Sequence, residues 1–158
     1  MNISPLPFDK ITTMSGLEVL HGMIAGDLPT PPFSQTTRIF LTTAEDGKVS
    51  FTGEPHADFF NPLGSIHGGW TASIMDSVMA CAVHSTLKPG EGYTTLEFKL
   101  HFCRPIMPDT GPVRAEGLVL SRGRRAATSE GKLFDSKGKL LAHGTETCLI
   151  FEMPTMRP

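Results

Sequence analysis

Hydrophobic residues recur at helical spacing near the start of the chain. Between residues 14 and 26 the apolar positions are Leu17, Leu20, Met23 and Ile24. This spacing predicts a short amphipathic helix, because residues three and four apart lie on one face. Ser15 and Glu18 form a capping-box pattern at its start, and Gly26 is expected to end it. The prolines between residues 29 and 32 should prevent the helix from resuming.

Strand-like patterns dominate much of the remaining chain. Two runs rich in β-branched and aromatic residues, 36–43 and 48–53, flank an Asp-Gly turn and predict a hairpin. Residues 55–65 are expected to be irregular. Four longer strands are predicted at Tyr93–Arg104, Gly111–Ser121, Arg124–Phe134 and Leu140–Phe151. The first of them alternates apolar with polar residues, so we expect a sheet with one buried face.

Residues 67–84 form the longest helical pattern, and apolar side chains occur on every side of it. A helix of this kind is expected to be buried. The order of elements therefore favours an α+β architecture, in which one antiparallel sheet of about six strands wraps around a long central helix. A short extra helix precedes the sheet. We expect a single domain over residues 1–158, with its core at about 14–151.

Composition narrows the class of protein. The chain has 158 residues, 39% hydrophobic and 19% charged, as expected of a folded soluble domain. A net charge of −2 argues against a general nucleic-acid binder, although a local basic patch stays possible. We expect neither a signal peptide in the first ten residues nor a membrane-spanning segment. Cys81, Cys103 and Cys148 lie in separate stretches, which favours free buried thiols and a cytoplasmic location.

Asp76 is the polar exception in the middle of the apolar helix. A carboxylate there is costly to desolvate, and burial without compensation raises its pKa. The side chain either faces solvent, pairs with an arginine or serves a function, and the spacing alone does not decide. Perturbed carboxylates in clefts are candidates for catalysis.

The segment that leads into this helix contains Asn61 and the sequence His67-Gly68-Gly69. Free N–H groups at a helix N-terminus can stabilise a developing oxyanion, and glycine lets a ligand approach the backbone. Simple loop geometry also explains two glycines, and a single histidine is more often structural than catalytic.

Gly68 and Asp76 are eight residues apart, which is about 12 Å along a helix. One small carbonyl group cannot contact both residues of the same helix. If both act on one substrate, the second must come from another copy of the chain, with two equivalent sites in a two-fold dimer.

The block Asn61…His67-Gly68-Gly69…Asp76 resembles the hotdog-fold acyl-CoA thioesterases of the PaaI type. The residues 94–99, Arg104-Pro105, the Ser-Gly-Leu-Glu element at 15–18 and the segment 138–145 resemble the same family. The likeness covers about residues 14–151, and its most specific part is the acid nine positions after the histidine.

The resemblance implies a hotdog fold, a homodimer usually paired into a tetramer, and hydrolysis of acyl-CoA thioesters. Asp76 would be the general base or nucleophile, and the N–H of Gly68 the oxyanion donor. Asn61 and His67 would orient the thioester. Thr95 would help to place the attacking water. The adjacent residues Gly69 and Thr94 would contact the substrate, and Thr94 offers the alternative register for the hydroxyl.

The turn Arg122-Gly123-Arg124-Arg125 is either a solvated connection or a clamp for phosphate, which arginine binds with its forked donors. In the resembling family this turn lies near the CoA nucleotide, and no single arginine is assigned. We expect no metal, since His84 and His101 have no partner at ligand spacing. CoA enters as part of the substrate, and no cofactor is expected.

Three other functions stay open. The chain could bind acyl-CoA without turnover, act as a hotdog enoyl-CoA hydratase, or be an interaction protein in which Asp76 is merely paired. The acyl group is also open, aromatic or short-to-medium aliphatic. Phe59, Phe60, Trp70 and Met79 are candidates for an acyl pocket, but a core position is favoured for each.

Overall fold

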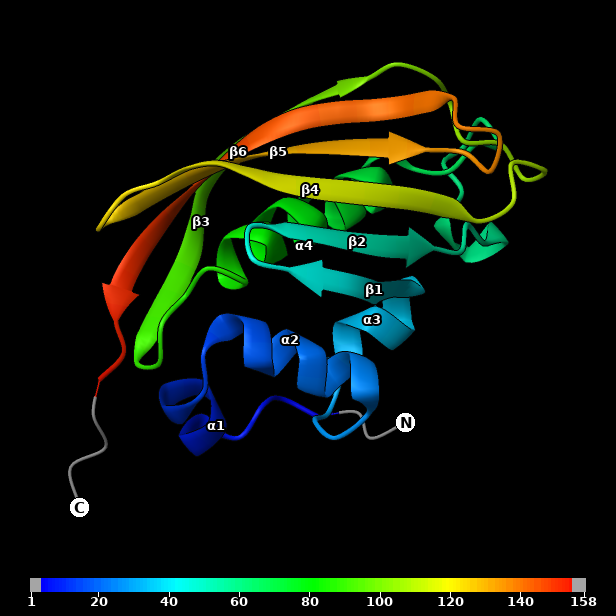
Figure 1. Cartoon of the computed structure of the whole chain (residues 1–158). Coiled ribbons are helices and arrows are strands. Elements are labelled where there is room, and N and C mark those ends of the chain that lie inside the picture. The colour runs from blue at the N-terminus through cyan, green and yellow to red at the C-terminus, as the bar shows by residue number, and fades with distance from the viewer. Residues whose placement is uncertain (1–3, 155–158) are drawn as a thin grey trace.

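The computed structural model describes residues 4–154. The expectation that the first ten residues are not a signal peptide falls partly outside this range, at residues 1–3. The centre of the structure is a six-stranded antiparallel sheet that curves around one long helix (Figure 1). The strands are β1 (Ile39–Glu45), β2 (Lys48–Gly53), β3 (Glu91–Phe102), β4 (Val113–Arg122), β5 (Ala126–Phe134) and β6 (Leu140–Glu152), in the order β1-β2-β4-β5-β6-β3. The predicted hotdog architecture is confirmed.

Helix α4 (Gly68–His84) is the buried element at the centre of the fold. Its apolar side chains point in all directions, and Ile74, Met75, Val78 and Met79 are fully buried. A Cβ on Gly117 of β4 would lie 2.2 Å from the carbonyl oxygen of Val78. Glycine at that position therefore lets the sheet approach the helix backbone.

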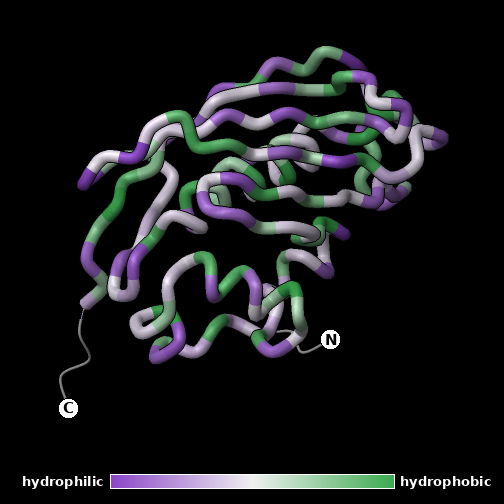
Figure 2. The backbone as a smooth tube through the Cα atoms, in the orientation of Figure 1, coloured by the Kyte–Doolittle hydropathy of each residue, from purple (hydrophilic) through white to green (hydrophobic). Residues whose placement is uncertain are grey.

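The hydropathy of the residues matches their place in the sheet and in the central helix. Hydrophobic and hydrophilic residues alternate along the strands, and α4 is mostly hydrophobic (Figure 2). The Asp-Gly turn between β1 and β2 is present, with Gly47 at φ 74°. No helix in the described part of the chain is long and apolar enough to cross a membrane.

Three short helices precede the sheet, where the sequence predicted one: α1 (Phe8–Thr13), α2 (Gly16–Ala25) and α3 (Pro32–Thr37). We call residues 8–37 the N-terminal layer. In α2 the capping box of Ser15 and Glu18 is formed, and Gly26 ends the helix at φ 85°. The layer is tied to the segment that follows α4, because the N–H of Gly16 donates to the carbonyl of Leu87 at 2.9 Å.

The predicted start of the first strand is wrong. Thr36 and Thr37 end α3, Arg38 adopts a left-handed conformation at φ 56°, and β1 begins only at Ile39. Pro32 occupies the start of α3, where its missing N–H costs no hydrogen bond. The prolines thus end one helix and begin the next. A 3₁₀ turn, η1 (Ala57–Phe59), also interrupts the segment expected to be irregular.

β3 forms one edge of the sheet and is poorly covered within one chain. Phe98 and Phe102 pair with Glu146 and Ala142 of β6, so they share the face that is turned towards α4. They are nevertheless 41% and 58% exposed, and Leu96 at the bulge in this strand is 58% exposed. The expected buried face is therefore incomplete along this edge.

Candidate active site

Asp76 lies near the middle of α4 and is half-buried. Its carboxylate Oδ1 lies 3.4 Å from the hydroxyl oxygen of Thr95 on β3. Burial raises the pKa of Asp76, and the hydrogen bond from Thr95 opposes this rise. Among the described residues no lysine, arginine or histidine forms an ion pair with it. Asp76 is thus neither fully solvated nor neutralised by an arginine.

The register of β3 decides which threonine faces Asp76. Thr95 pairs with the buried Cys148 and is half-buried, whereas Thr94 pairs with Leu149 and is exposed. Consecutive residues of a strand point to opposite faces, so only the Thr95 hydroxyl lies beside Asp76.

Glu146 was not foreseen as a member of this site. It is only 1% exposed, and the Thr95 hydroxyl lies 2.7 Å from its Oε1. The Cys148 thiol donates to the same oxygen at 3.2 Å. Burial raises the pKa of Glu146 to about 7; the hydrogen bonds from Thr95 and Cys148 oppose the rise, and repulsion from Asp76 and Glu97 adds to it.

A signal for Glu146 was present in the sequence. Alternate residues of β6 point towards α4, namely Ala142, Gly144, Glu146, Cys148 and Ile150. A single carboxyl group among small and apolar residues at this spacing marks a buried acid.

The start of α4 presents one free N–H group. His67 caps the helix, and its Nδ1 accepts a hydrogen bond from the Gly69 N–H at 2.8 Å. The Gly68 N–H has no acceptor within the described residues. Since Nδ1 is an acceptor, the neutral His67 ring carries its proton on Nε2. Gly68 therefore keeps its donor available, whereas that of Gly69 is used.

Asn61 organises the loop before α4. Its side-chain amide donates to the hydroxyl of Ser65 at 2.8 Å, and its Oδ1 accepts from the N–H of Leu63 at 2.9 Å. Its N–H also bonds the carbonyl of Ser65 at 2.8 Å. Within one chain, Asn61 thus fixes the approach to the helix N-terminus.

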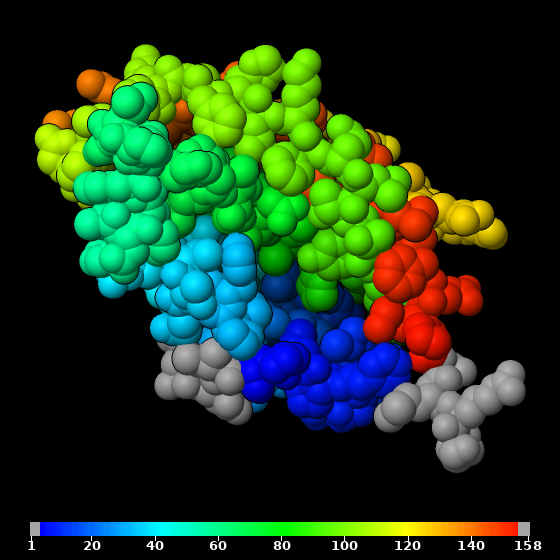
Figure 3. Space-filling view, turned by 180° about the vertical axis from the view of Figure 1, so that it is seen from behind, coloured from blue at the N-terminus to red at the C-terminus, as the bar shows by residue number. Residues whose placement is uncertain are grey.

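An apolar cavity of about 460 Å³ opens beside Asp76, between the N-terminal layer and α4. The hollow between the blue N-terminal helices, the cyan residues of α3 and the green residues of α4 and β3 is visible in Figure 3. Among its walls are Leu20, Met23, Ile24, Phe33, Ile39 and Phe51. Among the described residues that line it, Asp76 is the only acidic one. Burial lowers the pKa of His84, which also lines it, to about 4, so that side chain is neutral at physiological pH.

The four residues considered from the sequence as an acyl pocket do not line this cavity. Trp70 and Met79 are core residues, 5% and 0% exposed. Phe59 stacks on Trp70 with ring centroids 6.0 Å apart, and Phe60 is 37% exposed. The favoured core position holds for three of the four residues. The apolar positions Leu20, Met23 and Ile24 of the first predicted helix form part of the cavity wall, and their spacing was the signal in the sequence.

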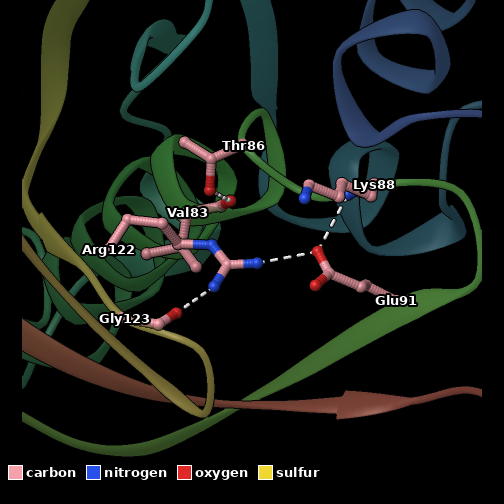
Figure 4. A network of polar contacts seen from close by, with 6 residues as sticks. All are labelled: Val83, Thr86, Lys88, Glu91, Arg122 and Gly123. Carbon is pink, nitrogen blue, oxygen red and sulfur yellow. Dashed lines mark hydrogen bonds and ion pairs between the residues drawn. The ribbon is translucent and has the colours of Figure 1, made fainter.

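The arginine turn between β4 and β5 divides into two parts. Arg122 Nη2 lies 2.7 Å from Glu91 Oε2, and its guanidinium also donates to the carbonyl of Gly123 (Figure 4). Arg124 and Arg125 are exposed and line a surface cleft of about 420 Å³ together with Glu91. Arg122 is thus held by its own chain, while the other two arginines face outward.

This turn lies within reach of a long ligand at Asp76. Thr95 pairs with Cys148, Cys148 with Ala127, and Ala127 with Arg122. Three strand spacings amount to about 14 Å across the sheet. The described residues include no group of three or more histidine, cysteine, aspartate or glutamate side chains placed to hold a metal.

Comparison with known families decides the class. Residues 63–142 match the model of the thioesterase superfamily. The chain belongs to this family. The match includes His67, Gly68, Asp76 and Thr95, and the predicted class of enzyme, a thioesterase, is confirmed.

Individual relatives agree with this assignment. The chain is 28% identical to human acyl-coenzyme A thioesterase 13 over 111 residues, which covers 70% of this chain and 78% of the relative. A phenylacetic acid degradation-related protein from Ralstonia eutropha superposes with a TM-score of 0.76 at 29% identity, covering 83% of this chain and 98% of that one. The E. coli PaaI protein has the same fold, with a TM-score of 0.75 at 19% identity over 87% and 94% of the two chains.

Proposed function

We propose that this protein hydrolyses acyl-CoA thioesters to a free carboxylic acid and CoA, at a site shared by two copies of the chain. The observation that carries the proposal is the position of Asp76, half-buried beside an apolar cavity, next to a hydroxyl and with no cationic partner among residues 4–154. The name of the human relative, an acyl-coenzyme A thioesterase, supports the substrate class.

Asp76 acts on the thioester carbonyl either as a general base or as a nucleophile. As a base it takes a proton from water, while the water oxygen bonds to the acyl carbon. The carbon–sulfur bond then breaks, and the proton passes to the sulfur of CoA. A carboxylate with a raised pKa is a stronger base than an ordinary aspartate, which suits this step.

The oxyanion donor comes from the partner subunit. Gly68 and Asp76 lie at the start and the middle of the same helix, about 12 Å apart along its axis. A second α4 running antiparallel beside the first brings a free Gly68 N–H close to Asp76. His67, Asn61 and Gly69 of that second copy surround the thioester and orient it.

The edge of the sheet supports such a dimer. β3 is unpaired on its outer side among the described strands, and Phe98 and Phe102 are exposed there. Long edge strands with exposed apolar residues invite pairing with another chain. Pairing of two β3 edges about a two-fold axis places the two α4 helices side by side. We propose a homodimer on this basis, with two dimers forming a tetramer.

The two ends of the substrate have different surroundings. The cavity walls are apolar apart from a few polar groups, so it suits an uncharged aliphatic or aromatic acyl group. At the β4–β5 turn, Arg124 and Arg125 are exposed donors for CoA phosphates, with Arg122 and Gly123 shaping the turn. Thr94, on the outer face, lies nearer to solvent.

The predicted cytoplasmic location belongs with this proposal.

The deciding experiment is a thioesterase assay over straight-chain and aryl acyl-CoAs, with wild type and the Asp76→Asn variant. We expect Asp76→Asn to lower kcat by about 10²–10⁴-fold, the usual contribution of a general base. Binding of a non-hydrolysable acyl-CoA thioether should persist. Asp109→Asn, at an exposed loop position, is the matched control and should leave kcat unchanged.

The alternatives give different results. Normal turnover by Asp76→Asn would exclude the mechanism. Tight binding of acyl-CoA by the wild type, without hydrolysis of any substrate, would make the chain a binding module. Addition of water to an enoyl-CoA would identify a hydratase.

A further inference from the structure

The hydroxyl of Thr95 lies between two carboxyl groups. Its oxygen is 2.7 Å from Glu146 Oε1 and 3.4 Å from Asp76 Oδ1. A threonine hydroxyl has one proton to donate and two lone pairs that accept. It can therefore donate to only one of these carboxyl groups at a time, and the other must be protonated to contribute a hydrogen bond of its own.

Glu146 is buried with one of its carboxyl oxygens left without a partner. It is 1% exposed, its Oε2 has no hydrogen-bond partner, and none of the ion pairs in the described chain includes it. On the neighbouring strand, the buried hydroxyl of Ser129 in the same register is also without a partner. Burying an unpaired carboxylate is costly, which favours the protonated form.

We propose that Glu146 is a positioning residue that acts on Asp76 through the Thr95 hydroxyl. In its protonated form Glu146 donates to the oxygen of Thr95, so the Thr95 proton points to the carboxylate of Asp76. When Glu146 is ionised, it takes the Thr95 proton for itself, and Asp76 loses this support. The inference rests on the proposed function, because Asp76 is the reactive group it serves.

The ionisable groups around Asp76 and Glu146 do not take over the titration of this pair. The other ionisable groups that act on them are Cys81 of α4, Tyr93 and Glu97 of β3, and Cys148 of β6. Burial raises the pKa of both thiols to about 12 and that of Tyr93 well above its usual value, so these stay neutral near pH 7. Glu97 lies on the outer face and accepts a hydrogen bond from Thr147.

Two carboxyl groups coupled in this way release their protons in two steps that belong to the pair. The form with one proton is the working one, with the charge on Asp76 and the proton on Glu146. The pH profile of kcat/KM should therefore fall on both sides of an optimum. Glu146→Gln keeps the shape and a donor for Thr95 but cannot ionise, so we expect the alkaline limb to disappear while the acid limb remains.

Two matched variants sharpen this test. Glu130→Gln removes a carboxylate from a partly exposed position on β5 and should leave the shape of the profile unchanged. In a Thr95→Val background, which removes the bridge, Glu146→Gln should change the profile no further. A Glu146→Gln profile with the same shape as the wild type, scaled or not, would overturn the inference.

A measurement on the intact acid covers the case in which Glu146→Gln fails to fold. Carboxyl ¹³C NMR of the wild type should show Glu146 titrating in two steps, and Asp76→Asn should reduce these to one. Two steps that persist in Asp76→Asn, or a single step in the wild type, would contradict the coupling. This readout needs no turnover, so a protein that hydrolyses no acyl-CoA would exclude the proposed function and leave the coupling testable.

Discussion

The hydroxyl oxygen of Thr95 on β3 lies 3.4 Å from the carboxylate of Asp76 on α4. The contact crosses from the edge strand to the central helix, beside an apolar cavity that Asp76 lines. It brings a neutral donor to a half-buried carboxylate that forms no ion pair with any residue the structure describes. The hydrogen bond is therefore the main local support for the charged form of Asp76.

Replacing Thr95 by valine should impair the proposed reaction. A hydrogen bond to a charged group contributes about 1.5–3 kcal/mol, so we expect kcat/KM to fall by roughly 10- to 100-fold. Because this bond lowers the pKa of Asp76, its loss should also move the acid limb of the pH profile to higher pH. Thr95→Ser should restore most of the activity, and Thr94→Val serves as the control on the opposite face. Equal rates for Thr95→Val and Thr94→Val would contradict the assignment.

Gly68 allows a direct test of the oxyanion donor. Gly68→Pro removes the N–H, yet proline is well tolerated at the first position of a helix. The conformation of His67, φ −61° and ψ 137°, already suits a residue before proline. We expect kcat to fall by about 10²–10³-fold, the usual effect of losing one such donor. Gly68→Ala keeps the N–H, and its Cβ would lie 3.7 Å from the Phe102 ring, an ordinary contact.

The same variant tests whether the site is shared. When Gly68→Pro and Asp76→Asn chains are unfolded together and refolded, half of the dimers are mixed, and each mixed dimer has one intact site. Activity should then recover to about a quarter of the wild-type value in a two-fold dimer. No recovery, with mixed dimers verified by mass spectrometry, would place both groups in one chain.

The cavity should control which acyl groups are accepted. Met23→Trp and Ile24→Trp each add bulk to the wall formed by α2. We expect KM to rise for long acyl-CoAs and to change little for short ones, since the short chains do not reach the filled space. Leu120→Trp, at a position 54% exposed on β4, is the control. Uniform effects on all chain lengths would argue that the acyl group binds elsewhere.

Glu146 should make stability depend on pH. Its pKa is raised from 4.5 to about 7 on folding, so the folded state binds more protons than the unfolded state between these values. The contribution of Glu146 to the free energy of unfolding should therefore be greatest below about pH 4.5, and should be lost as the pH rises through 7. Urea unfolding of wild type and Glu146→Gln across this range gives the difference. A wild type that gains stability relative to Glu146→Gln as the pH rises would refute the assignment.

The sequence by itself determined the elements whose signals are local. The capping box of Ser15 and Glu18, the glycine turn at Gly47 and the apolar periodicity of α4 each depend on residues within a few positions of one another. Such features depend on short-range hydrogen bonds and side-chain direction, so neighbouring residues are enough to predict them. The block from Asn61 through His67-Gly68-Gly69 to Asp76, together with the further matching segments, likewise indicated the family that the comparison confirms.

Other features were decided only by the tertiary structure. Which threonine faces Asp76 depends on the register of β3 against β6, including the bulge after Thr95. The approach of Glu146 to Thr95 joins residues of two strands that are distant in sequence. Arg122 is held by Glu91, and helices from the start of the chain close the cavity beside α4. No local pattern encodes these contacts, because they form only when distant segments pack and exclude water together.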